Sequence, residues 1–367
     1  MEDVVQITMG QSPDGSTYSD EPSDYILVQG NADLQNGWVC PRIWTTQITK
    51  KADAGDLIMS VRAPAGAMGK TAYNAVIGRG VAAIKGNEFI YQLLVKMDMD
   101  GFWKTLSCGS TFESLNSDNI KNAEVKVPIT AEQVQIGNFF RQLDNLITLH
   151  QRKYDKLTNV KKSMLEKMFP KNGSNVPEIR FKGFTDAWEQ RKLGEVGSVS
   201  MCRRIFKEQT SESGDIPFYK IGTFGGEADA FISKELFEEY KAKYPYPKKG
   251  DILISASGSI GRTVEFTGGN EYFQDSNIVW LNHDEHLDNS FLKCFYSVVK
   301  WAEIEGSTIK RLYNNNILNT VITLPSVAEQ QKIGQYFSTL DRLITLHQRK
   351  LEKLKNLKKA CLEKMFV

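Results

Sequence analysis

The sequence predicts an α+β protein in which two globular domains are separated by two long helices paired as an antiparallel, pseudo-two-fold coiled coil. Residues 127–170 and 324–367 are identical at 27 of 44 positions without a gap, at a constant offset of 197. Apolar residues in both copies recur with a mean spacing near 3.6, the period of an α-helix. Weaker matches at offsets of 195 and 197 extend the repeat into the segment before each helix.

Each copy of the repeat has one apolar seam, which steps by 3, 4, 4, 3, 3, 4 and 4 residues. The seams consist of Leu143, Leu146, His150, Tyr154, Leu157, Val160, Met164 and Met168, and of Leu340, Leu343, His347, Leu351, Leu354, Leu357, Cys361 and Met365. Matched seams predict that the helices pack on each other, and duplication favours the antiparallel arrangement because equivalent surfaces then meet. The predicted spacer and partner-contact positions are Leu143, Leu146, His150, Leu157, Leu340, Leu343, His347 and Leu354. The two histidines are expected to be buried and hydrogen-bonded across the seam.

The predicted boundaries are a first domain at 1–128, a helix at 129–169, a linker at 170–178, a second domain at 179–325 and a helix at 326–367. The first domain reads mainly as short strands and loops, with apolar bursts bounded by turn-forming residues. Thr130 is the predicted N-cap of the first helix, with Gln133 completing a capping box. Ser326 or Val327 is expected to cap the second helix.

The second domain repeats the first in weaker form. Residues 55–60 (GDLIMS) correspond to residues 250–255 (GDILIS), and residues 109–111 correspond to residues 306–308. Between these anchors the halves diverge, as in residues 61–72 against 256–264 and residues 10–18 against 201–209. A duplicated scaffold with different loops suggests one task performed on two different targets.

Composition is that of an ordinary globular protein, with 41% hydrophobic and 25% charged residues. No run of eighteen apolar residues and no secretory signal are present, so we expect a cytoplasmic protein without a membrane partner. The five cysteines are dispersed and form no CxxC pair. They indicate reduced, mostly packed thiols, and neither a disulfide framework nor a zinc site.

The small net charge of +2 hides an uneven distribution. Residues 141–167 carry seven Lys or Arg against three acids, and residues 338–364 carry eight against three. The helices together therefore hold +9, and the rest of the chain is acidic. Such charge is either a solvated helix face or a surface for phosphates or an acidic partner, and composition leaves both open.

Motifs that carry chemistry are missing. The sequence has no GxxxxGK[ST] loop, no HExxH, no GxSxG and no Asn-Pro-Pro-Tyr/Phe. His283 and His286 flank Asp284-Glu285, but two histidines three residues apart in a loop without a third strong ligand do not make a convincing metal site. We predict no catalytic residue and no metal, so the chain is interpreted as a binding protein.

Candidate binding loops combine cations, amides and hydroxyls, the groups that contact base edges and phosphates of DNA. A polar surface loop is the ordinary alternative for each of them. Their shared position after matched strands favours binding. The predicted DNA-contacting residues are Gln11, Ser12, Arg62, Lys70, Ser110, Thr111, Arg203, Arg204, Lys207, Ser257, Arg262, Thr308, Lys310 and Arg311.

A helix motif, LDxLITLHQRKxxKLxNxKKxxLEKMF, closes both halves of the chain, and the segment VPEIRFKGFTDAWEQRKLGE introduces the second half. This layout resembles the DNA specificity subunit of type I restriction-modification systems over essentially the whole chain. The resemblance implies two target-recognition domains that each read one half of a bipartite, asymmetric site in double-stranded DNA. It also implies that the helices fix the gap between the halves and dock partner subunits.

The implied partners are two modification subunits, which use S-adenosylmethionine to methylate adenine, and restriction subunits, which use ATP and Mg to translocate and cut. The chain itself is then expected to be a non-catalytic recognition subunit without a cofactor. It departs from the usual layout because nothing before Glu2 corresponds to residues 177–192, so we expect the first domain to lack this introductory segment. Two alternatives are a two-headed coiled-coil scaffold that binds proteins, and an enzyme with an unrecognised site. A gel shift with partner subunits and DNA, and a methyl-transfer assay on the chain alone, distinguish them.

Overall fold

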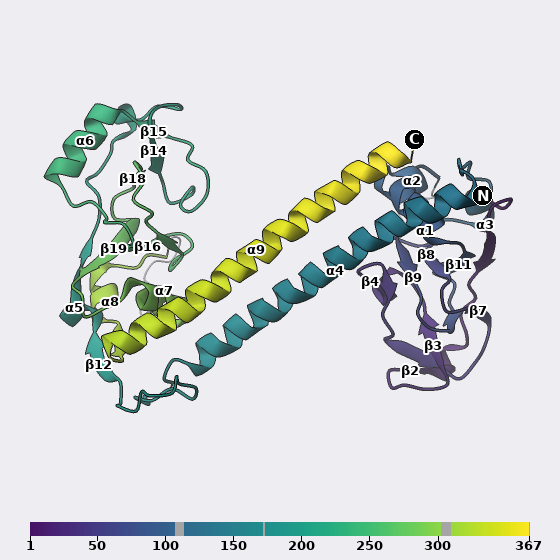
Figure 1. The fold of residues 1–367 in the computed structure, drawn as a ribbon, viewed down its shortest axis with the longest axis horizontal. Coiled ribbons are helices and arrows are strands. Elements are labelled where there is room, and N and C mark those ends of the chain that lie inside the picture. The colour runs from purple at the N-terminus through teal and green to yellow at the C-terminus, as the bar shows by residue number, and fades with distance from the viewer. Residues whose placement is uncertain (107–113, 172, 302–309, 367) are drawn as a thin grey trace. The chain divides into compact units, whose positions relative to one another are not determined.

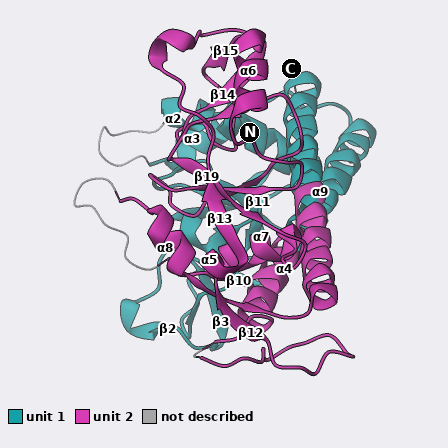
Figure 2. Cartoon of the chain, turned by 90° about the vertical axis from the view of Figure 1, so that its left-hand side faces the viewer, with its two compact units in different colours: residues 1–153, 347–367 teal, residues 154–346 magenta. Residues whose placement is uncertain are grey.

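The computed structural model describes residues 1–106, 114–171, 173–301 and 310–366. It divides into two compact units, coloured separately in Figure 2. Unit 1 comprises Met1–Lys153 and His347–Val367, and unit 2 comprises Tyr154–Leu346. Each unit therefore contains one of the two predicted domains together with part of both long helices.

Unit 1 consists of two sheets with short helices packed against them (Figure 1). The larger sheet has the strand order β1-β11-β8-β9-β5-β4, and the smaller has the order β2-β6-β3-β10-β7. The strands are β1 (Gln6–Met9), β2 (Tyr18–Ser19), β3 (Tyr25–Val28), β4 (Leu34–Gln35), β5 (Trp38–Val39), β6 (Ile43–Thr45), β7 (Lys50–Ala52), β8 (Leu57–Ser60), β9 (Met68–Lys70), β10 (Ala75–Ile77) and β11 (Val81–Lys85). The short helices are α1 (Glu88–Met99), α2 (Phe102–Leu106) and α3 (Ser117–Lys121).

Helix α1 lies in a region that the sequence predicted as mainly strands and loops. Its start is fixed by Asn87, whose side chain accepts a hydrogen bond from the backbone nitrogen of Ile90 at 3.1 Å. Seven of its twelve residues are buried, because the helix lies in the core of the unit. An apolar run of this length cannot be assigned to helix or strand by periodicity alone, which explains the omission.

The core of unit 1 joins the sheet to both long helices. Trp103 and Phe140 are completely buried, and Leu362 is 1% exposed. The ring of Phe366 lies 5.0 Å from that of Phe89 and 5.8 Å from that of Phe140, measured between centroids. The C-terminal part of the second long helix thus packs on the first domain, where the first long helix begins.

Unit 2 contains three small sheets among its described residues. Their strand orders are β12-β20, β13-β19-β16-β17 and β15-β14-β18. The strands are β12 (Glu189–Lys192), β13 (Gly197–Ser200), β14 (Ile216–Tyr219), β15 (Phe231–Ile232), β16 (Ile252–Ser255), β17 (Thr263–Glu265), β18 (Tyr272–Phe273), β19 (Ile278–His283) and β20 (Val321–Leu324). The short helices are α5 (Leu193–Val196), α6 (Lys234–Lys243), α7 (Asn289–Val298) and α8 (Asn314–Asn319).

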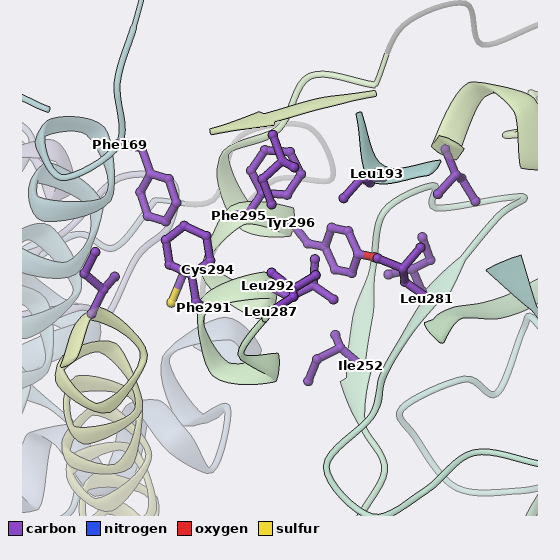
Figure 3. Close-up of a cluster of buried hydrophobic side chains, with 14 of the residues drawn as sticks. Phe169, Leu193, Ile252, Leu281, Leu287, Phe291, Leu292, Cys294, Phe295 and Tyr296 are labelled. Carbon is purple, nitrogen blue, oxygen red and sulfur yellow. The ribbon is translucent and has the colours of Figure 1, made fainter. Parts of the chain in front are cut away.

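An aromatic cluster forms the centre of one core of unit 2. The rings of Phe169 and Phe291 stack with centroids 5.4 Å apart, and both residues are labelled in Figure 3. Trp188, only 1% exposed, packs edge-on against them, at 6.0 Å from Phe169 and 5.8 Å from Phe291. Phe169 follows the first long helix and Trp188 precedes β12. The cluster therefore fixes the segment that connects that helix to the second domain.

The long helices are α4 (Thr130–Lys167) and α9 (Val327–Met365). The carbonyl oxygen of Ile129 accepts the first backbone bonds of α4, and that of Ser326 accepts those of α9. Ser326 was one of the two predicted caps, whereas the capping box at Thr130 is wrong. Thr130 lies inside the helix, and the side-chain nitrogen of Gln133 donates to the carbonyl oxygen of Pro128 at 2.9 Å.

Contacts between α4 and α9 confirm the antiparallel pairing. In unit 1, Lys358 Nζ lies 2.6 Å from Asp144 Oδ1, and His347 Nδ1 lies 2.8 Å from His150 Nδ1. Residue numbers rise along one helix as they fall along the other. In unit 2, Lys161 pairs with Asp341 at 2.5 Å, a pair that matches the first at the offset of 197 with the helices exchanged.

The predicted seam is only partly buried. Leu143 and Leu340 are each 7% exposed, and Leu157 and Leu354 pack partly buried against the cores. Leu343 is half-buried. Leu146 is 44% exposed, contrary to prediction. A contact between two helices covers only a narrow stripe, so apolar residues at its margin face solvent.

His150 and His347 are hydrogen-bonded across the seam as predicted, but they are half-buried and not fully buried. Loss of solvation lowers the pKa of His150, and the facing His347 together with Lys350 and Lys153 lowers it further. The neutral form of His150 is therefore favoured.

The cysteines that the structure describes are free thiols. Cys202 and Cys294 are buried, and burial raises the pKa of each thiol to about 12. Cys40 and Cys361 are half-buried, and Cys108 lies outside the described residues. Within the described part of the chain, no helix is both long enough and apolar enough to cross a membrane.

Candidate nucleic-acid interface

The two units contain the same loop after equivalent strands. In unit 1 it follows β8, and in unit 2 it follows β16 (Figure 1). The loops close with the backbone nitrogen of Gly66 donating to the oxygen of Ser60 at 2.8 Å, and that of Gly261 donating to Ser255 at 2.9 Å. Both glycines have a positive φ, 104° and 82°, which a side chain would strain. The matched GDLIMS and GDILIS segments therefore lead into structurally equivalent loops.

Each loop forms one β-bridge with a later segment, the one before α3 in unit 1 and the one before α8 in unit 2. Arg62 pairs with Ser114 in unit 1, and Ser257 pairs with Arg311 in unit 2. Beside the bridge of unit 1, the backbone nitrogen of Leu115 donates to the oxygen of Val61 at 2.9 Å. Beside that of unit 2, the backbone nitrogen of Leu312 donates to the oxygen of Ala256 at 2.8 Å. Both units thus place one arginine opposite one serine at the same position, with the two residue types exchanged between the strands.

Asn277 organises this bridge in unit 2. Its Oδ1 accepts a hydrogen bond from Ser257 Oγ at 2.8 Å and another from Arg311 Nη2 at 3.0 Å. The equivalent residue in unit 1 is Gly80, because the carbonyl oxygens of Gly80 and Asn277 both accept the bond from the first loop residue. Arg311 is consequently held in one orientation, whereas Arg62 is exposed.

A surface pocket of about 340 Å³ lies beside the bridge of unit 2. It is lined by Met201, Ser276, Arg311, Leu312, Tyr313, Asn314 and Asn315. Arginine and asparagine are the side chains that recognise guanine and adenine through paired hydrogen bonds, and an exposed tyrosine offers a face for stacking. Tyr313 is 49% exposed. The pocket therefore has the composition of a base-reading surface.

The remaining predicted cations of unit 2 lie on its surface. Arg204 is 67% exposed in its side chain, Arg203 stacks over the ring of Tyr244, and Lys207 starts a short turn of 3-10 helix. Arg262 Nη2 donates to the carbonyl oxygen of Gly225 at 3.3 Å. Lys310 is exposed next to Arg311.

In unit 1, the predicted residues differ in availability. Gln11 is exposed, and Ser12 Oγ accepts a bond from the backbone nitrogen of Arg79 at 3.2 Å. Lys70 Nζ is engaged inside the unit, 3.1 Å from Glu88 and over the rings of Trp38 and Tyr91.

Three predicted contacts, Ser110, Thr111 and Thr308, lie outside the described residues. Ser114 and Asn277 were missed by the sequence reasoning. A signal existed for Asn277, because it matches Gly80 at the same offset of 197 that relates the helices, and a substitution of glycine by asparagine marks a side chain gained in one half.

The histidine loop of unit 2 has a local structural role. His283 Nε2 lies 2.8 Å from Asn289 Oδ1, and its Nδ1 lies 2.8 Å from the backbone oxygen of Asp284. The side chain of His286 contacts Asp284 at 3.1 Å. Within the described ranges, no group of three or more His, Cys, Asp or Glu side chains is arranged to hold a metal ion.

The geometry defines a duplicated protein with one equivalent loop bridge per unit and two long helices that each contribute residues to both units. Comparison with known proteins gives its family. The family described as type I restriction modification DNA specificity domain matches residues 1–159 and 185–356. The chain belongs to this family.

Individual relatives agree with that assignment. The chain is 61% identical over 156 residues to a putative type I restriction enzyme specificity subunit of Haemophilus influenzae, a match that spans 42% of this chain and 40% of the relative. It is 25% identical over 338 residues to the type I restriction enzyme MjaIX specificity subunit of Methanocaldococcus jannaschii, spanning 85% of this chain and 76% of the relative.

Among solved structures, the S subunit of a type I restriction-modification system from M. genitalium has a TM-score of 0.69. The structural match spans 100% of this chain and 94% of the M. genitalium subunit, at 15% sequence identity. A likeness at this identity shows the fold alone, and that fold confirms the predicted class with two domains and paired helices.

Proposed function

We propose that the chain is the sequence-reading subunit of a type I restriction-modification complex, in which each unit recognises one half of a bipartite, asymmetric site in duplex DNA. The observation that supports this most strongly is the arginine–serine bridge, which occurs at the same loop position in both units with different surroundings. A shared position explains one common task. Different surroundings explain two different half-sites.

In unit 2, the chemistry of the bridge suits direct base readout. The bond from Arg311 Nη2 to Asn277 restricts the guanidinium plane, so less rotational freedom is lost when the group binds DNA. A fixed guanidinium can donate two parallel bonds to O6 and N7 of guanine in the major groove. The neighbouring Asn314 and Asn315 are exposed and can pair with adenine in the same way.

The surrounding cations suit phosphate contact. Arg203, Arg204, Lys207 and Lys310 are exposed on the same unit as the pocket. Phosphate contacts position a protein on the duplex and make its affinity fall as salt rises. For unit 1, the proposed DNA-contacting residues are Gln11, Ser12 and Arg62.

Adenine methylation and DNA cleavage are proposed to occur in partner subunits, with the chain itself non-catalytic. Two modification subunits would bind S-adenosylmethionine and flip the target adenine out of the duplex. Restriction subunits would use ATP and Mg. Exposed leucines along the long helices, Leu146, Leu149, Leu346 and Leu357, are each 43–46% exposed and offer apolar contacts for docking of the modification subunits.

The test is methylome sequencing of a host that carries the intact system with single variants of this chain. Arg311→Ala should relax or abolish recognition in one half of the motif, and Arg62→Ala in the other half. Loss of a bidentate contact costs about 1–3 kcal/mol, or roughly 5- to 150-fold in discrimination. Arg191→Ala removes an exposed cation paired with Glu189 and should leave the motif intact. An unchanged motif in both arginine variants would refute the proposed readout.

The gap between the half-sites is proposed to depend on α4 and α9, since each helix contributes residues to both units. Removing seven residues from both helices shortens each by about 10 Å while keeping the apolar seam close to its face. The methylated motif should then show a changed gap between unchanged half-sites. An unchanged gap would show that the helices do not set this distance.

A further inference from the structure

Unit 2 shows how its introductory segment, residues 176–192, is held. Arg180 forms two hydrogen bonds with Glu329, from Nε and Nη2, both at 2.7 Å. The ring of Phe181 packs edge-on against that of Tyr336, with centroids 5.9 Å apart. Trp188 fills the space beside Phe169 and Phe291, and β12 then pairs antiparallel with β20. A charge pair, aromatic contacts and a strand thus fasten one extended segment to the start of α9 and the strand before it.

The same surface exists in unit 1. Gly137 of α4 and Gly334 of α9 are 197 apart, and a side chain on either would lie 3.0 Å from the backbone nitrogen of Phe89 or Phe291, respectively. Phe89 is therefore the counterpart of Phe291. Phe366 is the counterpart of Phe169 at the offset of 197, and the Phe89 and Phe366 rings are 5.0 Å apart.

At the position that Trp188 occupies in unit 2, unit 1 has a groove of about 560 Å³. It is lined mainly by apolar side chains and by the segment before α4. The lining includes Phe89, Leu93, Met97, Phe102, Ile136 and Phe366, together with residues 124–128 and Glu132. Two members of the aromatic cluster are thus present, and the place of the third is open.

The extended segment that lines the groove, residues 124–127, has no strand partner among the described residues. Residues 124–127 correspond to β20 at the offset of 197, but they belong to no strand in the part of unit 1 that the structure describes. Ile322 of β20 is completely buried, whereas its counterpart Val125 is half-buried. Val127 is 37% exposed. An extended segment with unpaired backbone groups readily accepts another strand.

The charged and aromatic contacts have counterparts as well. Glu329 is completely buried under Arg180, and its counterpart Glu132 is exposed at the groove. Phe139, the counterpart of Tyr336, is 39% exposed. The extended segment, the carboxylate and the aromatic ring therefore follow one another along unit 1 in the same order as along unit 2, and the groove lies beside them.

The register of an incoming segment is also defined. In unit 2 the backbone nitrogen of Leu193, the residue after β12, donates to the oxygen of Thr320 at 2.9 Å. In unit 1 the amino nitrogen of Met1 donates to the oxygen of Ala123, the counterpart of Thr320, at 2.8 Å. A strand that runs antiparallel in the register of β12 would therefore place four residues opposite residues 124–127.

We infer that this groove of unit 1 binds an extended polypeptide segment with the chemistry of residues 180–192: an arginine for Glu132, a tryptophan for the cavity beside Phe89 and Phe366, and a four-residue antiparallel strand for residues 124–127. This interaction surface is separate from the arginine–serine bridge. It can be tested without DNA, and its failure would leave the proposed DNA readout unaffected.

The first test uses the full chain and a fluorescent peptide with the sequence of residues 176–192. We expect saturable binding with one peptide per chain, measured by fluorescence anisotropy. Binding should fall at least tenfold when the peptide carries Trp188→Ala, and when the chain carries Glu132→Gln. Glu166→Gln, which alters an exposed carboxylate of α4 in unit 2, is the matched control and should change nothing.

The second test joins the same seventeen residues directly to Met1, because a covalent link raises the effective concentration to the millimolar range. Hydrogen exchange of the amides of residues 124–127 should slow at least tenfold, and the effect should disappear when the joined copy carries the Trp188→Ala change. Slowed exchange supports the inference even where free peptide binds too weakly to detect. The inference is overturned if neither test shows an effect, or if the tryptophan and Glu132 changes make no difference.

Discussion

The ion pair between Arg180 and Glu329 allows a quantitative test of how the introductory segment is fastened to unit 2. Two hydrogen bonds of 2.7 Å join the groups, and the side-chain exposures are 13% for the arginine and 1% for the glutamate. Replacing Arg180 by methionine keeps much of the side-chain volume but leaves a buried carboxylate without its partner. Removal of one partner from a buried pair costs about 3–5 kcal/mol.

The expected effect is local to β12, β20 and the segment before them. Hydrogen exchange measured by mass spectrometry on peptides covering β12 and β20 reports this local opening free energy. Arg180→Met should lower it by about 3 kcal/mol or more, and the double variant Arg180→Met, Glu329→Met should recover most of the loss because no unpaired charge remains.

Arg191→Met is the matched control for this measurement. Its guanidinium pairs with Glu189 at 2.8 Å, but the side chains are 43% and 64% exposed. Exposed pairs contribute about 0–1 kcal/mol, so exchange should change little. If Arg180→Met also changes the opening free energy by less than about 1 kcal/mol, the ion pair does not hold the segment and the reasoning is wrong.

Two further predictions concern the packing of the long helices. Phe140→Ala should destabilise unit 1 by about 3–5 kcal/mol in urea unfolding because the ring is completely buried. Leu146→Ala, at 44% exposure, should cost about 0.5 kcal/mol or less. Equal costs of the two substitutions would contradict the burial pattern. The lowered pKa of His150 means that the unfolded chain binds its proton more readily, so stability should decline as pH falls below the ordinary histidine value of 6.5 and level off once the folded state is protonated. Melting temperatures between pH 7.5 and 5.5 should therefore depend less on pH in His150→Gln than in the unaltered chain, and an equal dependence in the two proteins would contradict the reasoning.

Much of the architecture could be predicted because the repeat is strong and long. The two helices, their antiparallel pairing and the division into two related halves followed from the apolar period and from the offset of 197. Short elements were harder to predict. Helix α1 has an apolar run that fits a strand equally well, and the start of α4 is fixed by the backbone of Ile129 and not by the polar side chain of Thr130.

The candidate interface was predicted only in outline. Arg62 and Arg311 were singled out separately, because sequence reasoning sees them as members of unrelated loops. Their equivalence depends on two backbone bridges between residues more than fifty positions apart, to Ser114 and Ser257. The prediction for Lys70 could not take account of Glu88, eighteen residues away, whose carboxylate forms an ion pair with the ammonium group of Lys70.

By itself, the sequence determined the duplication, the two long helices and the resemblance to a DNA specificity subunit, because these depend on local periodicity and on identity at a fixed spacing. Only the tertiary structure decided which equivalent positions are covered and which are open. Glu329 is buried beneath Arg180, whereas its counterpart Glu132 is exposed at a groove. The helix repeat reads EQ at both places, so the sequence does not distinguish them. Burial depends on what packs against a residue and not on the residue itself.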